Sequence, residues 1–243
     1  MLVEGSSIKD LSIVVPAFNE ELILERNVNR LVKFFQPLLD CPWELIIADN
    51  RSTDKTAKIG RRLAESVNGV RYIYTDRKGV GAALKKAWSS CSSDILCYTD
   101  LDLPFPLENL YTLCETISAG YDIAIGSRYV KGGSYHTNMG RKFLSRLYSY
   151  WLKILFSCKF SDHCGIKAIK REAFLKLMPL VNSDDWFFGT ELLIRAEKMG
   201  YAVRELPVHA HNDSHRNSKV KLFRTMWDYV RLSFKLRWEL WWK

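Results

Sequence analysis

The stretch YTDLDLPFP, residues 98 to 106, places two carboxylates two positions apart directly after a short apolar run. In an extended segment residues i and i+2 point to the same side, so Asp100 and Asp102 should project together. Two anions held that close repel each other unless a positive charge lies between them. Such oxygen ligands suit Mg²⁺ or Mn²⁺, which can in turn hold a diphosphate. The alternative is a strand end whose acids merely cap a helix.

Polar side chains also follow two earlier apolar runs. The first run ends in VVPAFNEE, where a dinucleotide-binding protein would carry GxGxxG, and this counts against a nicotinamide or flavin enzyme. The second ends in ADNRSTDKT, whose serine, threonine and second aspartate could serve as ordinary helix N-caps. Capping does not explain Asp49, which comes earlier, at the strand end, and could accept hydrogen bonds from a base.

A third apolar run is followed by RKGVG, residues 77 to 81, whose glycines open a predicted helix. Backbone N–H groups at such a helix start, next to two cations, could approach a phosphate. Glycine is also common there for steric reasons alone, because it lets two backbones come close. Both explanations stay open from the sequence.

Hydrophobic periodicity predicts the elements that position these side chains, with short β-branched runs alternating with helical patterns. We expect strands at 11–17, 43–49, 70–75, 94–100 and 121–127, and helices at 20–39, 54–67, 80–91 and 107–119. This alternation indicates an α/β fold with a mostly parallel sheet and helices on both faces. Ligands of such sheets bind beyond the carboxyl ends of the strands, where Asp100 and Asp102 would lie.

The second half of the chain is less regular. We expect a helix at 141–156, the motif CGIKAIKRE, a helix at 190–199, a strand at 203–208 and a final helix after a polar loop. The simplest partition is a catalytic domain over 1–218 and a basic, aromatic amphipathic helix over 219–243. That helix would lie at a membrane interface or serve as a packing element.

Composition excludes several classes of protein. With 243 residues, 47% of them hydrophobic, the chain can bury a large core and is not disordered as a whole. Its six cysteines are scattered, and neither a CxxC pair nor a secretory leader is visible. We therefore expect a reducing cytosol rather than a disulfide framework or a zinc cluster. No apolar run approaches the roughly eighteen residues of a membrane span.

The net charge of +9 is concentrated at one end, since the last 28 residues carry +6. If residues 220–243 are helical, their aromatic side chains share one stripe at about 100° per residue. The stripe comprises Phe223, Trp227, Val230, Phe234, Trp238 and Trp241. Tryptophan on one face with Lys and Arg on the other is typical of a helix in a bilayer interface. Packing on the sheet or on a partner subunit is the alternative, and the helix at 141–156 could add a second membrane contact.

Eight motifs, in order, carry a resemblance to a known family: SIVVPAFNE, IIADNRSTDKT, RKGVGAAL, YTDLDLPFP, IAIGSRY, CGIKAIKRE, FFGTELLIRAEKMGY and VRELPV. They resemble the family-two glycosyltransferases of the Rossmann-like GT-A fold, and more narrowly the dolichyl-phosphate (polyprenyl-phosphate) mannosyl and glucosyl synthases. The resemblance covers about residues 10 to 220. It implies inverting transfer of a hexose from GDP-mannose or UDP-glucose to a lipid phosphate, with Mg²⁺ or Mn²⁺ as cofactor.

The resemblance also implies roles for individual residues. The nucleotide sugar would contact a set of turn and loop residues, together with a lysine beside the glycines: Pro16, Asn19, Glu20, Asp49, Lys78, Asp100, Arg216 and Lys219. The metal would be held by Asp100 and Asp102, which form the DxD motif. The acceptor phosphate would meet Arg128, Arg141 and Ser145. The catalytic candidates are Asp102, Arg128 and Glu191.

Two positions depart from the family pattern. Pro104 stands where many relatives carry a polar residue that joins the metal, so coordination would rely on the two aspartates, the diphosphate and water. The second motif reads Asp49-Asn50-Arg51 where Asp-Asp-Gly is more common, which leaves base contacts beyond Asp49 open.

The implied reaction has a simple chemical logic. A metal at the DxD motif, helped by Arg216 and Lys219, would stabilise the charge of the departing diphosphate. A phosphate monoester has a second pKa near 6, so the nucleophile is already charged at neutral pH and needs cations rather than a base. The guanidinium fork of Arg128 or Arg141 matches phosphate oxygens, although Arg141 could instead belong to a solvated helix face.

Other classes of function make different demands on the sequence. A nucleotidyltransferase should show a glycine-rich basic loop after the first strand, but PAFNEE is acidic. A nucleic-acid binder could use the basic tail but would leave the ordered acids unexplained. A glycosyltransferase with another acceptor and an inactive adaptor in a membrane complex are further alternatives. We expect a peripheral protein on the cytoplasmic face of a membrane, with a possible membrane-protein partner and no nucleic acid.

Overall fold

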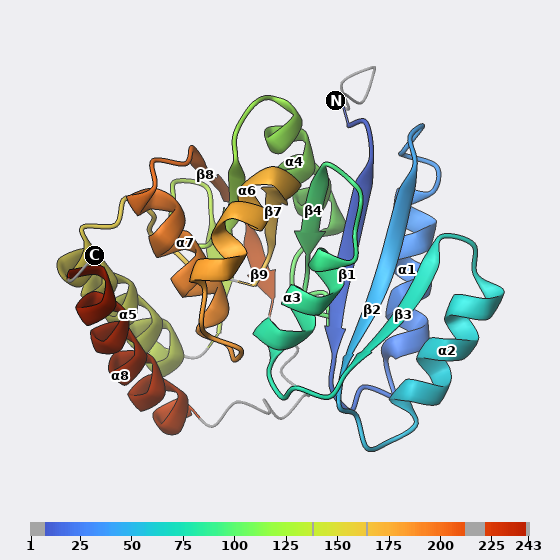
Figure 1. The fold of residues 1–243 in the computed structure, drawn as a ribbon, viewed down its shortest axis with the longest axis horizontal. Coiled ribbons are helices and arrows are strands. Elements are labelled where there is room, and N and C mark those ends of the chain that lie inside the picture. Colours follow the sequence, from blue (N-terminus) through green and yellow to red (C-terminus); the bar gives the residue numbers. More distant parts are fainter. Residues whose placement is uncertain (1–7, 138, 164, 212–221, 242–243) are drawn as a thin grey trace.

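The computed structural model describes residues 8–137, 139–163, 165–211 and 222–241, and it is built around a seven-stranded sheet (Figure 1). The strands of this sheet, in spatial order, are β3 (Val70–Thr75), β2 (Trp43–Asn50), β1 (Leu11–Ala17), β4 (Ile95–Tyr98), β7 (Lys167–Lys170), β5 (Ile123–Ser127) and β8 (Val203–Pro207). All neighbours pair in parallel except β7, which is antiparallel to both β4 and β5. The predicted mostly parallel sheet is therefore confirmed.

Helices cover both faces of the sheet, as the periodicity predicted. They are α1 (Leu24–Phe35), α2 (Thr56–Ser66), α3 (Val80–Ser89), α4 (Leu107–Ser118), α5 (Met139–Phe156), α6 (Arg171–Leu177), α7 (Phe188–Lys198) and α8 (Leu222–Trp241), with a short 3₁₀ turn at Met178–Leu180. Alternation within β1 serves both layers, because Ile13 and Val15 join the core under α1 and α4. Val14 joins the core under α3, α6 and α7. Burying each such side chain contributes about 1.5–3 kcal/mol.

A two-stranded parallel sheet stands apart from the main one. It pairs β6 (Ser134–His136) with β9 (His209–His211). Its first strand follows β5 after a turn that contains Gly133, whose N–H donates to the carbonyl oxygen of Val130. Tyr135 of β6 thereby comes close to the end of β5, where the candidate site lies.

The helices α5 and α8 lie side by side at the edge of the molecule remote from β2 and β3 (Figure 1). Aromatic pairs join them, with ring centroids 5.1 Å apart for Tyr148 and Tyr229 and 5.2 Å apart for Trp151 and Phe234. On the side of α8 that faces the domain, Ser233 and Leu236 are buried. None of the helices in the described part of the chain is both long and apolar enough to cross a membrane.

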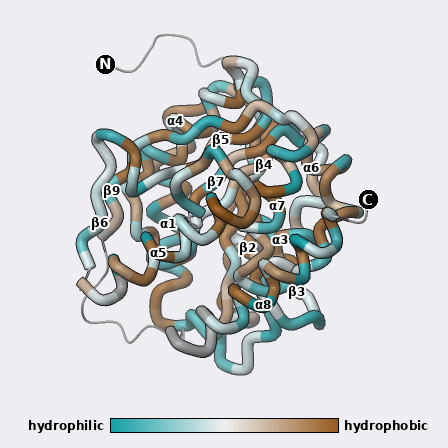
Figure 2. Tube along the Cα trace, turned by 90° about the vertical axis from the view of Figure 1, so that its left-hand side faces the viewer, coloured by the Kyte–Doolittle hydropathy of each residue, from teal (hydrophilic) through white to brown (hydrophobic). Residues whose placement is uncertain are grey.

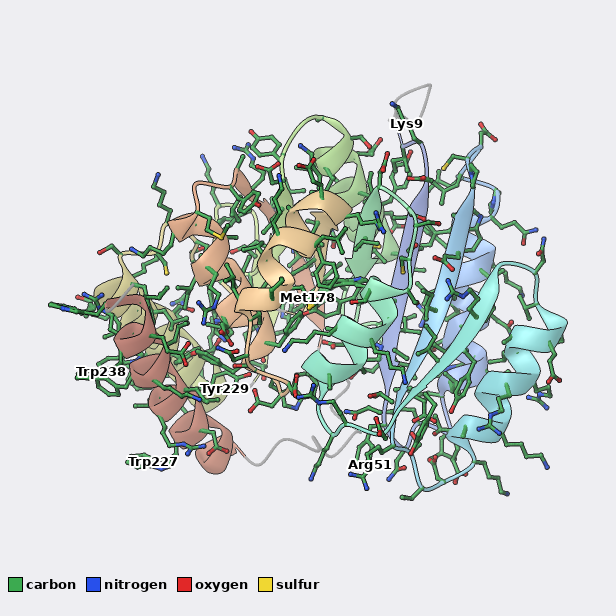
Figure 3. All side chains as sticks on the ribbon, viewed as in Figure 1. Lys9, Arg51, Met178, Trp227, Tyr229 and Trp238 are labelled. Atoms are coloured by element: carbon green, nitrogen blue, oxygen red, sulfur yellow. The ribbon has the colours of Figure 1, made fainter. Side chains whose placement is uncertain are left out.

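The carboxyl ends of β1, β2 and β4 meet at one edge of the sheet, and the chain takes an unusual conformation just after each of them. Asn19, Arg51 and Leu103 have φ of 54°, 59° and 50°, the left-handed region that non-glycine residues rarely adopt. Figure 3 labels Arg51 at this lower edge. Backbone strain of about 1–3 kcal/mol per residue tends to collect at functional sites, which makes this edge a candidate functional site.

Candidate active site

The two carboxylates lie where the sequence predicted, just beyond the end of β4. Asp100 is half-buried and Asp102 is exposed. Burial, and then repulsion from Asp102, raises the pKa of Asp100 to about 7, although the positive charges of Lys167 and Arg128 oppose the shift. A Cβ added to Gly165 would overlap the Asp100 carboxylate, so glycine at 165 leaves the space that the acid occupies.

This pair fits a divalent cation that takes most of its ligands from elsewhere. Among the residues that the structure describes, no group of three or more His, Cys, Asp or Glu side chains could hold a metal. Mg²⁺ commonly keeps one or two protein carboxylates and completes its shell with phosphate oxygens and water. Burial raises the pKa of Asp100 most and the charge of Asp102 adds to it, and a bound cation would oppose both effects.

The stability of the metal-free protein should depend on Asp100. The pKa of Asp100 is about 7 in the folded state and takes its ordinary value of 3.8 in the unfolded state. Between these two pH values the folded protein therefore binds more protons than the unfolded one. The contribution of Asp100 to the free energy of unfolding should therefore fall as pH rises from about 4 to 7, while His163, whose pKa burial lowers to about 4, contributes the opposite trend. In Asp100→Asn the first contribution should vanish, so the stability of that variant relative to the unchanged protein should rise over the same interval. Urea titrations in EDTA at several pH values measure the difference, and identical slopes would contradict it.

The first and second strand-end turns are joined by hydrogen bonds. The Asn19 side-chain oxygen accepts from the Thr53 N–H at 2.7 Å, while the Asn19 N–H donates to Ser52 Oγ at 3.0 Å. The Glu20 N–H donates to Thr56 Oγ1 at 2.8 Å. Pro16 pairs with Ala48 across the two strands, so the structure brings the residues of the predicted nucleotide-contacting turn to the end of β2.

Asp49 connects the end of β2 to the turn that follows it and to β3. It is fully buried, and its carboxylate accepts from the Ser52 N–H at 2.9 Å and from the Tyr72 hydroxyl at 2.5 Å. Burial and the Asp49 hydrogen bond raise the pKa of Tyr72, which keeps that hydroxyl protonated as a donor. Asp49 thus holds the turn in shape, and its contact with a base stays a prediction.

The glycines at 79 and 81 are explained by close packing against the loop before α7. A Cβ at Gly79 would overlap the carbonyl oxygen of Asp184, and φ at Gly79 is 127°. Asp184 also pairs with Arg77 and with Lys85. The Gly79 N–H donates to the Asn50 side chain at 3.0 Å, which ties this segment to the β2 end. Lys78 is exposed in the same loop.

Gly79→Ala should therefore destabilise the fold by about 3 kcal/mol or more, since it adds a clash with rigid backbone to the strain of a positive φ. Gly120→Ala is the matched control, because φ at Gly120 is 112° and nothing lies within 4 Å of an added Cβ. Gly120→Ala introduces the backbone strain but no clash, so it should lower the free energy of unfolding clearly less than Gly79→Ala does. Chemical denaturation compares the two, and equal losses would refute the packing explanation.

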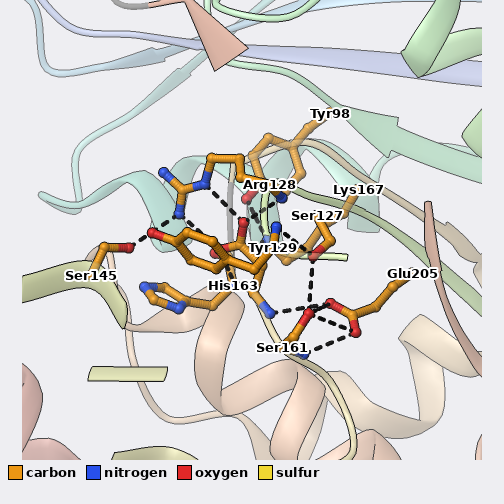
Figure 4. Close-up of polar contacts among 10 residues, drawn as sticks. Tyr98, Ser127, Arg128, Tyr129, Ser145, Ser161, His163, Lys167 and Glu205 are labelled. Carbon is orange, nitrogen blue, oxygen red and sulfur yellow. Dashed lines mark hydrogen bonds and ion pairs between the residues drawn. The ribbon is translucent and has the colours of Figure 1, made fainter. Parts of the chain in front are cut away.

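Arg128 and Ser145, two of the predicted acceptor-phosphate residues, come together at the end of β5 (Figure 4). Arg128 Nη2 lies 3.4 Å from Ser145 Oγ, and its guanidinium also pairs with the buried Asp162. The side chain of Arg141, in the first turn of α5, lies outside the described part of the structure, as do Arg216 and Lys219. Their predicted roles stay predictions.

Glu191, predicted to be catalytic, is buried within α7 and surrounded by donors. Its carboxylate accepts from the N–H of Asn182, from the N–H and hydroxyl of Ser183, and from Arg195 Nε at 2.8 Å. Burial alone would raise the pKa of Glu191, but these hydrogen bonds hold it below its usual value. Arg195 Nη2 also forms an ion pair with Glu239 on α8, at 2.9 Å. In this geometry Glu191 fixes the loop before α7, and a direct part in catalysis stays a prediction.

Three residues of the site were not predicted from the sequence: Asp162, Gly165 and Lys167. Asp162 and Gly165 precede the antiparallel strand β7, which lies beside β4, and Lys167 is its first residue. Lys167 is buried, with Nζ 3.4 Å from the Tyr98 hydroxyl and 3.4 Å from the His163 carbonyl oxygen. The motif CGIKAIKRE marked this segment, but the sequence contained no signal that β7 would run against β4.

Comparison with known proteins gives the site a context. The family model described as glycosyl transferase family 2 matches residues 12–178. Glycosyltransferase AglD of Haloferax volcanii is 35% identical over 203 residues, which are 82% of this chain and 32% of that protein. A dolichyl-phosphate hexose transferase of the same organism is 27% identical over 206 residues, which are 82% of each chain. The chain spans about a third of the length of two of the curated relatives that it matches.

A solved structure has the same fold. Glucosyl-3-phosphoglycerate synthase from Mycobacterium tuberculosis, crystallised with Mn²⁺, UDP-glucose and phosphoglyceric acid, superposes with a TM-score of 0.70. The match covers 94% of this chain and 79% of that one, at 24% sequence identity. This likeness confirms the predicted GT-A arrangement of a mostly parallel sheet with helices on both faces. The family model covers well over half of the residues, and the chain therefore belongs to glycosyl transferase family 2.

Proposed function

We propose that the protein transfers a hexose, mannose or glucose, from GDP-mannose or UDP-glucose to a polyprenyl or dolichyl phosphate, with inversion and with Mg²⁺ or Mn²⁺. The observation that carries this proposal is the pair Asp100 and Asp102 at the carboxyl end of β4, in a chain of glycosyl transferase family 2. Relatives named as dolichyl-phosphate hexose transferase and dolichol-phosphate mannosyltransferase support the choice of acceptor.

On the donor side, Asp100 and Asp102 would hold the metal ion. When bound, the metal supplies Lewis-acid stabilisation of the departing diphosphate. Asn19 and Glu20 stand in the hydrogen-bonded turns that would receive the nucleotide, with Asp49 below them. We assign Pro16 to the same contact surface, and Lys78, Arg216 and Lys219 to the phosphates.

On the acceptor side, the protein has to bind a phosphate dianion rather than remove a proton. A guanidinium can fork two phosphate oxygens, and Arg128 stands beside Ser145 for that role. We assign Arg141, the third residue of α5, to the same phosphate. Cations gathered here would hold the attacking oxygen near the donor and lower its repulsion from the diphosphate.

A lipid substrate requires contact with a membrane, and α5 with α8 offers a suitable surface. The exposed large apolar side chains of these two helices are Met139, Phe143, Leu147, Tyr150, Ile154, Trp227, Phe234, Trp238 and Trp241. We call them the aromatic surface. Figure 3 shows Trp227 and Trp238 projecting away from the body, while Tyr229 points toward it. Figure 2 views the molecule from the side on which α5 and α8 lie.

Basic side chains border the aromatic surface, which points to an anionic bilayer. Arg231 and Lys235 on α8 are exposed next to it, and the guanidinium carbon of Arg237 lies 4.8 Å from the Trp241 ring centroid. Apolar residues on one face with Lys and Arg beside them fit a helix in the bilayer interface. We therefore assign residues 219–243 to a membrane-interface element and place the protein peripherally on a cytoplasmic membrane face, with room for a membrane-protein partner.

The experiment that tests this function offers the full chain GDP-mannose and UDP-glucose separately, each carrying a labelled sugar. Polyprenyl phosphate in detergent is the acceptor, with Mn²⁺ or Mg²⁺, and phosphoglyceric acid replaces it in a parallel series. Metal-dependent label in the organic phase supports the proposal and identifies the donor. Label only in the aqueous product would assign another acceptor, and nucleotide binding without transfer would favour an adaptor.

A further inference from the structure

Asp162 is a buried carboxylate that is hydrogen-bonded to Arg128, near the candidate acceptor site. Its side chain is fully buried and accepts three hydrogen bonds from Arg128: from the backbone N–H at 2.8 Å, from Nε at 2.8 Å and from Nη2 at 2.7 Å. The His163 N–H adds a fourth at 2.8 Å. Burial alone would raise the pKa of Asp162, but Arg128 holds it below its usual value, so the acid stays ionised.

The segment that carries Asp162 is itself fixed to the sheet. Glu205 on β8 accepts from the Ser161 N–H at 2.9 Å, from the Ser161 hydroxyl at 2.9 Å and from the Asp162 N–H at 3.1 Å. These contacts join the residues before β7 to a strand two positions away in the sheet (Figure 4). The Asp162 carboxylate therefore stands on a rigid support.

Aromatic rings restrict Arg128 from other directions. The guanidinium carbon lies 4.4 Å from the ring centroid of Tyr135 on β6 and 5.4 Å from that of Tyr129. An arginine has five N–H donors, and Asp162 takes those along the Nε and Nη2 edge. Nη2 also lies 3.4 Å from Ser145 Oγ, so the guanidinium extends from Asp162 toward α5.

We propose that Asp162 is a positioning residue for the reaction: it fixes the orientation in which the Arg128 guanidinium meets the phosphate of the acceptor lipid. This inference rests on the proposed function, since it assigns the ligand of Arg128 to the acceptor. A guanidinium that is held before the substrate arrives loses less conformational freedom on binding. An Arg128 released from Asp162 would still carry its charge but would no longer be aimed.

The test compares Asp162→Asn with the unchanged protein. The amide keeps the shape of the acid, but its NH₂ group meets N–H donors whichever way it is turned, because both carboxylate oxygens accept from N–H groups. The KM for polyprenyl phosphate should rise about 10- to 100-fold, as for a misplaced binding group. The KM for the nucleotide sugar should change less than about 2-fold, since the turns that would receive the nucleotide follow other strands, β1 and β2.

Two further variants separate positioning from general loss of structure. In an Arg128→Lys background, Asp162→Asn should raise the acceptor KM little further, because both changes disable the same contact. Glu172→Gln removes a carboxylate on the exposed side of α6 and should leave both KM values unchanged. An Asp162→Asn protein with unchanged acceptor KM, with equal losses toward donor and acceptor, or with an additive effect in the Arg128→Lys background would overturn the proposal.

Equilibrium binding of farnesyl phosphate, a short polyprenyl phosphate, keeps this test separate from that of the function. Binding without transfer by the unchanged protein would reject the proposed function, and a 10- to 100-fold weaker affinity in Asp162→Asn would still support the positioning role. Absence of binding by the unchanged protein would overturn both. If Asp162→Asn does not fold, Glu205→Gln, which loosens the same segment, should weaken farnesyl phosphate binding in the same direction, and unchanged binding would refute the inference.

Discussion

Asp102→Asn is expected to reduce hexose transfer at least about a thousandfold, because it removes half of the protein's share of the metal shell. Asp102 is exposed, so its loss should change the melting temperature by no more than about 3 °C. The rate should recover only partly at high metal concentration, since the amide oxygen is a weaker ligand than a carboxylate. Initial rates over a range of Mn²⁺ concentrations measure both effects.

The matched control is Asp94→Asn, at the opposite end of the same strand. Asp94 is exposed just before β4 begins, far from the strand end where the other acids lie. It should keep full activity and the same dependence on metal. If Asp102→Asn retained most of its activity at low metal, the metal role of this pair would have to be abandoned.

Replacing Trp227, Trp238 and Trp241 together by Ser should lower the partitioning of the protein to anionic vesicles about 100-fold or more. These side chains are 72%, 67% and 68% exposed, so the fold should tolerate the change. Each would contribute on the order of 1 kcal/mol or more by entering the bilayer interface. Sedimentation with phosphatidylcholine vesicles, with and without phosphatidylserine, gives the partition coefficients, and added salt should weaken the anionic case.

A control for this variant lies on the other helices. Leu175 on α6 and Met199 after α7 are also exposed apolar residues, and replacing both by Ser should leave vesicle binding unchanged. Transfer to a water-soluble short-chain acceptor should survive the tryptophan changes, while transfer to a long-chain lipid in vesicles should fall. Undiminished vesicle binding by the triple variant would show that the aromatic surface serves another purpose.

The sequence predicted the long, periodic elements well and the short ones poorly. The strand at 11–17 was predicted with the bounds that it has, because five β-branched or aliphatic residues alternate between two buried layers. The strands β6, β7 and β9 have only three or four residues and mix polar with apolar side chains, whereas β4, with four residues, was predicted because it is an apolar run. The strand β7 matters most among these, since it brings Gly165 and Lys167 to the acid pair.

The candidate site could be predicted only where its chemistry was local in sequence. Asp100 and Asp102 are two residues apart and follow β4 directly, although they lie in a turn, with the Leu103 N–H donating to the Asp100 carbonyl oxygen, rather than in the extended segment that was expected. The partnership between Arg128 and Asp162 spans 34 residues and needs the antiparallel insertion of β7, which no periodicity encodes. Periodicity also predicts which residues share a face of a helix, but not which other elements pack against that face. Glu239 of the last helix, for example, contacts Arg195 and Asn182 of the domain.

The most direct test of the proposed function is the chemical structure of the product made by the full chain from a nucleotide sugar and polyprenyl phosphate with Mn²⁺. Mass spectrometry and ³¹P NMR of the purified lipid should show one hexose joined through its anomeric carbon to the phosphate, a phosphodiester in place of the monoester. The anomeric configuration should be opposite to that of the donor. A lipid that keeps its monoester while the sugar is released to water, or is joined to another acceptor, would contradict the proposal.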